Sequence, residues 1–354
     1  MSDAQKWLVV TFLSVCVWLI YLLSSVLLPF VFAAMLAYLA DPVADKLEAC
    51  RLSRIQAVSL VFIVMSLIVV LILLWLIPAM EYQISRFLAN LPAYAVWLNQ
   101  HFTPWLEQHL DLEIGPVDMN KMAAILKSHW QKAGGVAAAL LSSMSRSGTV
   151  IFEWLLNLML VPVVMFYLLR DWDVLMLKIK DLLPRRITPV VTRLAGEVDV
   201  VLAAFLRGQF LVMLALGVIY SFGLWLIGLD LALVIGMLAG LISFVPYLGS
   251  LVGIVVAVIA ALFQFHDVSS LIFVALVFGA GQLVEGMVLT PWLVGNKIGL
   301  HPVAVIFAVL AGGQLFGFLG VLLALPVASA IMVLMRHLHD IYHDSDFYSQ
   351  TGKS

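Results

Sequence analysis

Three stretches without a charged residue or a histidine, each 34 residues long, constrain this chain more than any other feature. They cover residues 7–40, 232–265 and 302–335. A single straight helix of that length would measure about 51 Å and overshoot a hydrocarbon core about 30 Å thick. Two full spans need about 40 residues, more than each stretch provides. Each stretch therefore predicts two shorter helices joined by a break.

The composition places the chain in a lipid bilayer. Of its 354 residues, 64% are hydrophobic and only 11% are charged, whereas an average soluble domain is about 25% charged. The apolar stretches are continuous rather than alternating, which favours helices over barrel strands. We expect an all-α polytopic membrane protein with about eight membrane segments. Two of them, 232–265 and 302–335, would be broken or re-entrant hairpins arranged as a candidate inverted repeat.

The distribution of lysine and arginine predicts the topology, because cytoplasmic loops are enriched in both. Residues 41–54 and 170–208 are rich in these side chains and are expected in the cytoplasm, as are both termini of a protein in the bacterial inner membrane. The first long stretch is expected to turn near Ser24–Pro29. The predicted segments are an N-terminal membrane scaffold (1–77), an extracytoplasmic amphipathic helical segment (78–149), a span (150–169), a cytoplasmic amphipathic segment (170–208), a transport half (209–335) and a cytoplasmic tail (336–354).

The two hairpin sequences match each other at their centres. A shift of 71 residues places Pro246-Tyr247-Leu248-Gly249 on Gly317-Phe318-Leu319-Gly320. Pro246 removes a backbone donor, and Gly249 is expected to adopt a positive φ. A kinked continuous helix is the alternative. Inverted repeats with discontinuous helices recur in transporters, with substrate sites near the breaks, so these prolines and glycines are candidates for a substrate or ion pathway.

Glu285 is the outstanding candidate for a functional side chain, because it is the only ionisable residue within 268–296. A charge at the centre of a membrane helix costs about 2.5–3.5 kcal/mol on insertion scales. Gln282 lies on the same helical face, and Gly281 and Gly286 would let another backbone come close. Two interpretations stay open: a site for a cation, a proton or a polar substrate, or a structural carboxyl bonded to a neighbouring helix.

Other polar residues stand at the ends of membrane segments. Arg170-Asp171 closes the span 150–169 and would act as an interfacial anchor or as a gate. His301-Pro302 precedes the last hairpin, where a lone interfacial histidine is more often structural.

Enzyme and metal motifs are missing from the sequence. It contains no HExxH, no GxSxG and no P-loop. Cys16 and Cys50 predict neither a disulfide framework nor a metal site. We therefore expect no enzyme, no catalytic residue, no cofactor and no bound metal. A basic patch with interleaved aromatic residues is also missing, so nucleic acid is not an expected partner.

Four strings resemble the autoinducer-2 exporter (AI-2E) family of bacterial membrane proteins. They are FYLLRDWD (166–173), FVPYLGSLVG (244–253), QLVEGMVLTPWLVGNKIGLHP (282–302) and FGFLGVLLALPVASA (316–330). Met287 departs from the family pattern, which often has asparagine there. The resemblance marks these positions as family motif residues: Pro246, Gly249, Gln282, Glu285, Gly286, Pro291, His301, Pro302, Gly317, Gly320 and Pro326.

The resemblance implies secondary transport. Members of the family have been associated with export of autoinducer-2 and others with sodium/proton antiport, so we expect a small polar solute or a cation as the transported partner. In this interpretation the half with the two hairpins would move against a scaffold made by 7–169, and the amphipathic segment 78–149 would support a homo-oligomer. The rival predictions are a membrane scaffold without transport and a passive channel.

Overall fold

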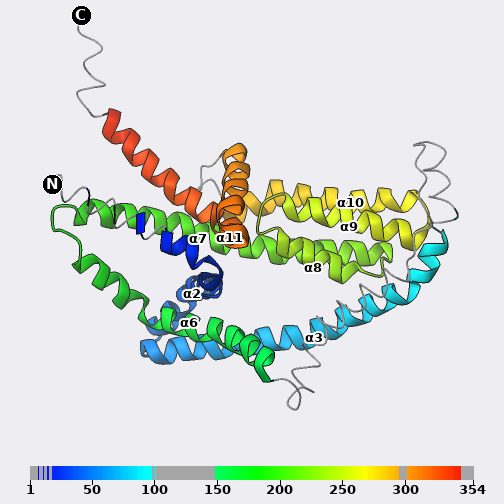
Figure 1. Ribbon diagram of the computed structural model, residues 1–354, viewed down its shortest axis with the longest axis horizontal. Helices are drawn as coiled ribbons and strands as arrows, with labels where there is room; N and C mark the ends of the chain where they lie inside the picture. Colours follow the sequence, from blue (N-terminus) through cyan, green and yellow to red (C-terminus); the bar gives the residue numbers. More distant parts are fainter. Residues whose placement is uncertain are drawn as a thin grey trace, which may run out of the picture. The chain divides into compact units, whose positions relative to one another are not determined.

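A computed structural model of the chain describes residues 18–97, 148–294 and 301–343, together with positions 7, 11, 14, 15 and 100. Every regular element in these residues is a helix (Figure 1), which confirms the prediction of an all-α polytopic protein. The helices are α2 (Ser24–Ala49), α3 (Arg54–Trp97), α6 (Gly148–Asp181), α7 (Thr188–Ile227), α8 (Ala232–Ile242), α9 (Leu248–Phe265), α10 (Ser269–Val284), the π-helix η2 (Glu285–Val294) and α11 (Pro302–His343).

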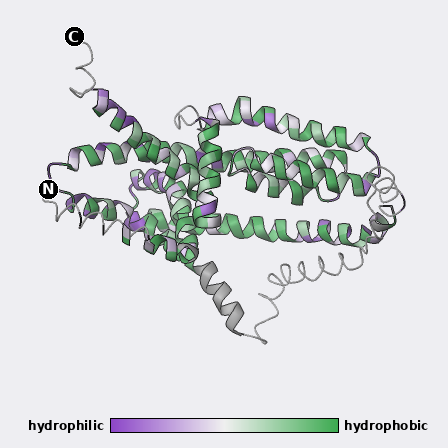
Figure 2. Cartoon of the chain, turned by 45° about the horizontal axis from the view of Figure 1, so that its top comes forward, coloured by the Kyte–Doolittle hydropathy of each residue, from purple (hydrophilic) through white to green (hydrophobic). Residues whose placement is uncertain are grey.

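Six helical stretches in the described residues are long and apolar enough to cross a membrane. They are Val26–Ala49, Arg54–Tyr94, Thr188–Ile227, Leu248–Phe265, Ser269–Leu293 and Val303–His343, and α8 is a shorter apolar helix. α6 covers the predicted span 150–169 but is not among these six. Large apolar side chains such as Leu74 and Trp75 are about two-thirds exposed, and apolar residues line most of each helix (Figure 2). Exposed apolar surface of this extent needs a hydrocarbon solvent.

The chain divides into two compact units. Unit 1 consists of Met1–Val64, Leu155–Gly208 and Val294–Ser354, and unit 2 consists of Met65–Trp154 and Gln209–Leu293. The first hairpin, 232–265, belongs to unit 2, and the second hairpin, 302–335, belongs to unit 1.

Small residues bring the helices of unit 2 into close contact. A Cβ atom on Gly240 would approach the backbone of Gly217 to less than 3.0 Å, and one on Gly236 would approach Ser221 equally closely. Small residues at such contacts allow membrane helices to pack backbone against backbone. α9 packs between α8 and α10, and the three helices run side by side in Figure 1.

The N-terminal stretch departs from its predicted turn. The chain leaves ideal helical geometry at Leu23, with φ −93° and ψ 8°, and then continues as one helix, α2, with Pro29 inside it. Proline is tolerated within membrane helices because neighbouring groups satisfy the freed carbonyl. Pro29 therefore does not form the break. In the segment 78–149, α3 continues to Trp97, and most of the remainder lies outside the described residues.

Candidate functional site

The first hairpin is broken at its centre. α8 ends at Ile242, α9 begins at Leu248, and the positive φ of 67° belongs to Tyr247. The predicted role of Gly249 in supplying a positive φ was therefore wrong. Gly249 lies in the first turn of α9 and is buried, and a Cβ atom there would fall less than 3.0 Å from Ser243 and from the Ala239 carbonyl. Its missing side chain lets the two arms of the hairpin touch.

Side chains satisfy polar groups at the tip of this hairpin. Gln209 on α7 donates a hydrogen bond from Nε2 to the carbonyl oxygen of Ser243. The Ser243 hydroxyl donates to the carbonyl oxygen of Ala239 at 2.8 Å, and both Gln209 and Ser243 are buried. Irregular backbone at membrane depth is tolerated only where protein or water supplies such partners.

The other end of the first hairpin is held by α3. Oε1 of Gln83 accepts hydrogen bonds from the N–H groups of Leu233 and Val234, at 3.1 and 3.2 Å. These are first-turn donors of α8, which lack partners within the helix. Arg86 also forms an ion pair with the buried Asp230 carboxylate at 3.2 Å. The base of the hairpin thus lies beside the continuation of α3, on the same side of the membrane in the predicted topology.

The base is closed by a second set of bonds. The Gln264 amide donates to the Gly228 carbonyl oxygen and accepts from the Asp230 N–H, both at 2.7 Å. Asp267 accepts hydrogen bonds from the backbone N–H and the hydroxyl of Ser269 at the start of α10. These bonds stabilise the charged carboxylate, so the pKa of Asp267 lies below its ordinary value.

Glu285 is buried at the junction of α10 and η2, with 5% of its surface exposed. Gln282 donates a hydrogen bond from Nε2 to Glu285 Oε2 at 2.9 Å, as their spacing on one helical face predicts. The backbone changes from α-helix to π-helix at Glu285. Such π segments are rare and frequently mark functional sites.

Tyr220 on α7 completes this site, and sequence reasoning missed it. Its ring stacks on Phe278 with centroids 4.6 Å apart and covers Gly281, where a Cβ atom would come within 3.0 Å of the ring. Gly281 lies one turn before Glu285, which interacts electrostatically with the Tyr220 hydroxyl. That hydroxyl is buried and has no hydrogen-bond partner within the described ranges. No sequence motif distinguishes Tyr220 from the other tyrosines.

Helix lengths place Glu285 level with the tip of the first hairpin. α9 and α10 are adjacent, joined by the short turn at His266–Val268. The helical rise carries the chain about 26 Å from Phe265 to Leu248, and about 24 Å from Ser269 to Glu285. The broken tip and the buried carboxylate are therefore at similar distances from the base of unit 2.

The second hairpin folds back at a single residue. Gly317 has φ 58° and ψ −137°, which interrupts α11. A Cβ atom on Gly320 would lie less than 3.0 Å from the Gly312 carbonyl group, although a straight helix would separate these residues by roughly 12 Å. Phe318 beside the turn stacks on Phe32 of α2, and Pro326 is buried in the second arm.

The remaining predicted residues between the hairpins have peripheral positions. A Cβ atom on Gly286 would meet open space among the described residues, so no backbone approaches it there. Pro291 is exposed within η2. His301 Nδ1 accepts a hydrogen bond from the Val303 N–H at 3.3 Å, and Pro302 is the first residue of α11, where proline is favoured. His301 and Pro302 thus begin a helix.

Arg170 and Asp171 pair with each other. The guanidinium group donates two hydrogen bonds to the Asp171 carboxylate, at 2.8 and 2.7 Å, and lies 4.9 Å from the centroid of the Tyr167 ring. These bonds hold the pKa of Asp171 below its usual range. Within the described part of the chain, the pair makes no printed bond to another helix, so a gating role stays a prediction.

Arg54 is a second side chain that sequence reasoning missed. It donates hydrogen bonds to Asp41 at 2.7 Å, to Asp45 at 2.6 Å and to the Leu169 carbonyl oxygen at 2.9 Å. The Asp173 carboxylate lies 3.9 Å from it. Counting basic residues for topology does not reveal such pairing. A usable signal existed in the acidic residues that precede Arg54 at helical spacing: Asp41, Asp45 and Glu48.

Comparison with known proteins now identifies the family. The sequence pattern of the AI-2E family transporters matches residues 8–340. The chain belongs to this family. It is 27% identical over 320 residues to "Putative transport protein YrrI" of Bacillus subtilis (strain 168), covering 90% of this chain and 88% of that protein. It is also 27% identical over 318 residues to "Putative permease PerM" of Escherichia coli (strain K12), covering 90% and 89%.

Membership of the AI-2E family makes the chain a multi-pass bacterial membrane protein of the transporter or permease class. The names of its relatives point away from an enzyme. Among the described residues, no group of three or more histidine, cysteine or acidic side chains could hold a metal ion.

Proposed function

We propose that this AI-2E family member is a secondary transporter that exports a small polar solute across the bacterial inner membrane, with autoinducer-2 as the first candidate. One observation carries the proposal. The buried Glu285 carboxylate, paired with Gln282, lies beside an unpartnered buried hydroxyl, that of Tyr220, at the level of a broken hairpin.

The energetic argument starts from the cost of buried polar groups. A hydroxyl left unpaired in an apolar environment costs about 1–3 kcal/mol, and a carboxyl group within a membrane segment is expensive in either protonation state. A bound solute with hydroxyl groups can donate to Glu285 and accept from Tyr220, which offsets this cost. The broken hairpin adds the discontinuous helix that transporters place near their substrate sites.

A sodium/proton antiporter is the second candidate. The same carboxyl group favours it, because a single membrane-embedded carboxylate can bind either a proton or a cation. In this case flux would be driven by a pH gradient and would require Glu285, and the Tyr220 hydroxyl would supply an oxygen ligand.

The deciding experiment measures flux from proteoliposomes loaded with autoinducer-2 or with sodium, with and without a pH gradient. The variants are Glu285→Gln and Tyr220→Phe, which remove the charge and the hydroxyl while preserving shape. Glu81→Gln is the matched control, because Glu81 is an exposed carboxyl on α3. We expect wild type and Glu81→Gln to transport equally and Glu285→Gln to abolish gradient-driven flux.

Each alternative result has a specific meaning. Flux that ignores both the gradient and Glu285 would indicate a passive channel and would reject the coupled transporter. An inactive wild type with both loads would reject both candidate substrates and favour a membrane scaffold. Transport by Glu285→Gln at the wild-type rate would make Glu285 structural and move the search to Pro246, Gly249, Gly317 and Gly320 at the hairpin tips.

We also infer the orientation and assembly that the sequence predicts: cytoplasmic termini, an extracytoplasmic segment 78–149 and a homo-oligomer built on that segment. The Arg54–Leu169 bond supports part of this topology, because it joins the two basic segments 41–54 and 170–208 at one side. Labelling of single cysteines at positions 46 and 178 with a membrane-impermeant reagent tests it. Labelling of either position from the periplasm of intact cells would overturn the orientation.

A further inference from the structure

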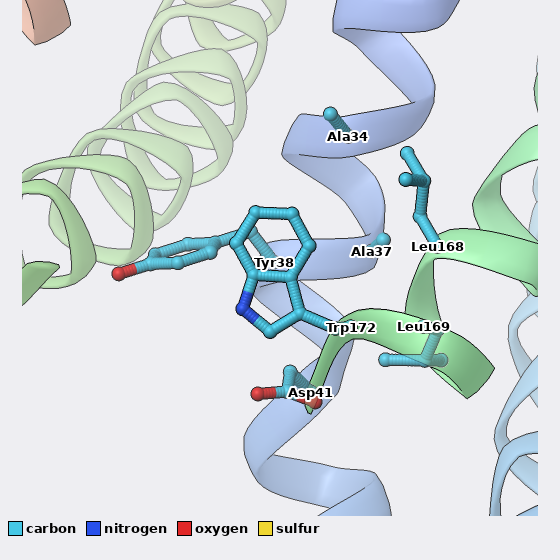
Figure 3. Close-up of a pocket in the computed structure, with 7 residues that line it drawn as sticks. All are labelled: Ala34, Ala37, Tyr38, Asp41, Leu168, Leu169 and Trp172. Carbon is cyan, nitrogen blue, oxygen red and sulfur yellow. The ribbon is translucent and has the colours of Figure 1, made fainter. Parts of the chain in front are cut away.

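Unit 1 contains a hollow that the transport site of unit 2 does not use. It has a volume of about 250 Å³, is open to solvent, and lies between α2 and α6 (Figure 3). The floor is buried, since Ala37 is 5% exposed and Leu169 is 1% exposed. Alanines on α2 face bulky residues on α6, which leaves the space unfilled. The lining residues are Ala34, Ala37, Tyr38, Asp41, Leu168, Leu169 and Trp172.

Two aromatic rings form walls of the hollow. The Tyr38 hydroxyl donates to the main-chain oxygen of Asp199 at 2.8 Å and also to the Asp199 carboxylate. Figure 3 shows this hydroxyl directed away from the other labelled residues, with the Trp172 indole ring between Tyr38 and α6. The bonds to Asp199 fix the tyrosine ring, which therefore offers an aromatic surface and no free donor. Aromatic faces attract cations.

Asp41 is the only charged residue among those that line the hollow. Its Oδ1 atom accepts the hydrogen bond from Arg54, while Oδ2 makes no hydrogen bond within the ranges that the structure describes. Arg54 is also shared with three other carboxylates within 4.0 Å, those of Asp45, Glu48 and Asp173. One guanidinium group against four carboxylates leaves an excess of negative charge beside the hollow.

We propose that this hollow binds a small primary ammonium compound, with its N–H groups donating to Asp41 Oδ2 and its positive charge against Trp172 and Tyr38. The excess of carboxylates repels an anion. A bare divalent cation needs several oxygen ligands, and the lining supplies one carboxylate. A quaternary ammonium ion can contact the rings but has no N–H group for Asp41. The proposal is independent of the transport proposed for unit 2.

The test measures binding of methylammonium and ethanolamine to the full-length protein in nanodiscs by isothermal titration, at constant ionic strength with sodium chloride as the reference salt. Tetramethylammonium is the comparison ligand without N–H groups. The variants are Asp41→Asn and Trp172→Leu. The matched controls are Asp45→Asn, which loses an Arg54 partner but does not line the hollow, and Trp225→Leu, at an exposed tryptophan in unit 2.

We expect saturable binding of both primary amines by wild type and weaker binding of tetramethylammonium. Asp41→Asn and Trp172→Leu should each weaken binding by about tenfold or more, equivalent to about 1.4 kcal/mol. Asp45→Asn should cause a severalfold smaller decrease, and Trp225→Leu none. An absence of saturable amine binding by folded wild type would overturn the proposal. Wild-type affinity in both Asp41→Asn and Trp172→Leu would overturn it as well, and so would an equal loss in Asp45→Asn and Asp41→Asn.

Discussion

The two hairpins share a sequence pattern but turn by different means. The first uses a tip of several residues, with Tyr247 at positive φ and the Ser243 carbonyl held by Gln209. The second turns at Gly317 alone. What they share is the glycine that follows, Gly249 or Gly320, at which the two arms touch. The pattern aromatic-Leu-Gly thus encodes contact between the arms, while each turn is built from its own surroundings.

The largest effect is expected from a methyl group at the shared contact. Gly320→Ala and Gly249→Ala each place a Cβ atom within 3.0 Å of backbone atoms of the opposite arm. Overpacking against backbone should destabilise the protein by about 3 kcal/mol. Thermal unfolding of the purified variants in detergent measures the loss.

Gly279→Ala is the control, because a Cβ atom at Gly279 meets no described atom within 4 Å and alanine favours the helix. Normal stability of both hairpin variants would show that the arms can separate without cost.

The second prediction exploits the difference between the turns. Gly317→Ala forces a side chain into a backbone conformation that suits glycine, at a cost of about 1–3 kcal/mol. Tyr247→Gly relieves a positive φ, and the side chain it removes is 60% exposed, so its net effect should stay within about 1 kcal/mol. Melting temperatures of the two variants test this asymmetry. It fails if both substitutions destabilise the protein equally.

A third, smaller effect is expected at the tip of the first hairpin. Gln209→Leu leaves the buried Ser243 carbonyl oxygen without its side-chain donor, which should cost about 1–2 kcal/mol. Gln314→Leu is the matched control near the second tip, where the glutamine is exposed. Chemical denaturation of both variants measures the difference. Equal stability of the two variants would mean that water replaces the Gln209 amide.

The smallest effect concerns pH and the link after the first hairpin. Hydrogen bonds from Ser269 depress the pKa of Asp267, so its stabilising contribution is present above the unfolded pKa, about 3.9, and is lost as pH falls through the folded pKa. Asp267→Asn should lower the melting temperature slightly at pH 7 and little at pH 3. A decrease of the same size at both pH values would contradict the assignment.

The sequence alone was sufficient for local features and insufficient for distant contacts. Run length and the Pro-Gly pattern predicted both breaks, and residue spacing predicted the Gln282–Glu285 bond. The position of positive φ was misassigned to Gly249, because the preference of glycine for that region was weighed above its role in close packing. Tyr220 and Arg54 were missed because their partners lie many residues away, at Gly281 and Leu169, and no spacing rule links such positions.

The division of the chain into interleaved units has a consequence for synthesis. Unit 2 has all of its residues once translation reaches Leu293, whereas unit 1 combines the first 64 residues with the last 61. At about 5–20 residues per second, the ribosome needs roughly 3 to 10 seconds to continue from there to His343. During that interval, the N-terminal helix α2 waits in the membrane without the aromatic partner that Phe318 will provide. A nascent chain halted after residue 293 would contain one complete unit and one that lacks its own hairpin.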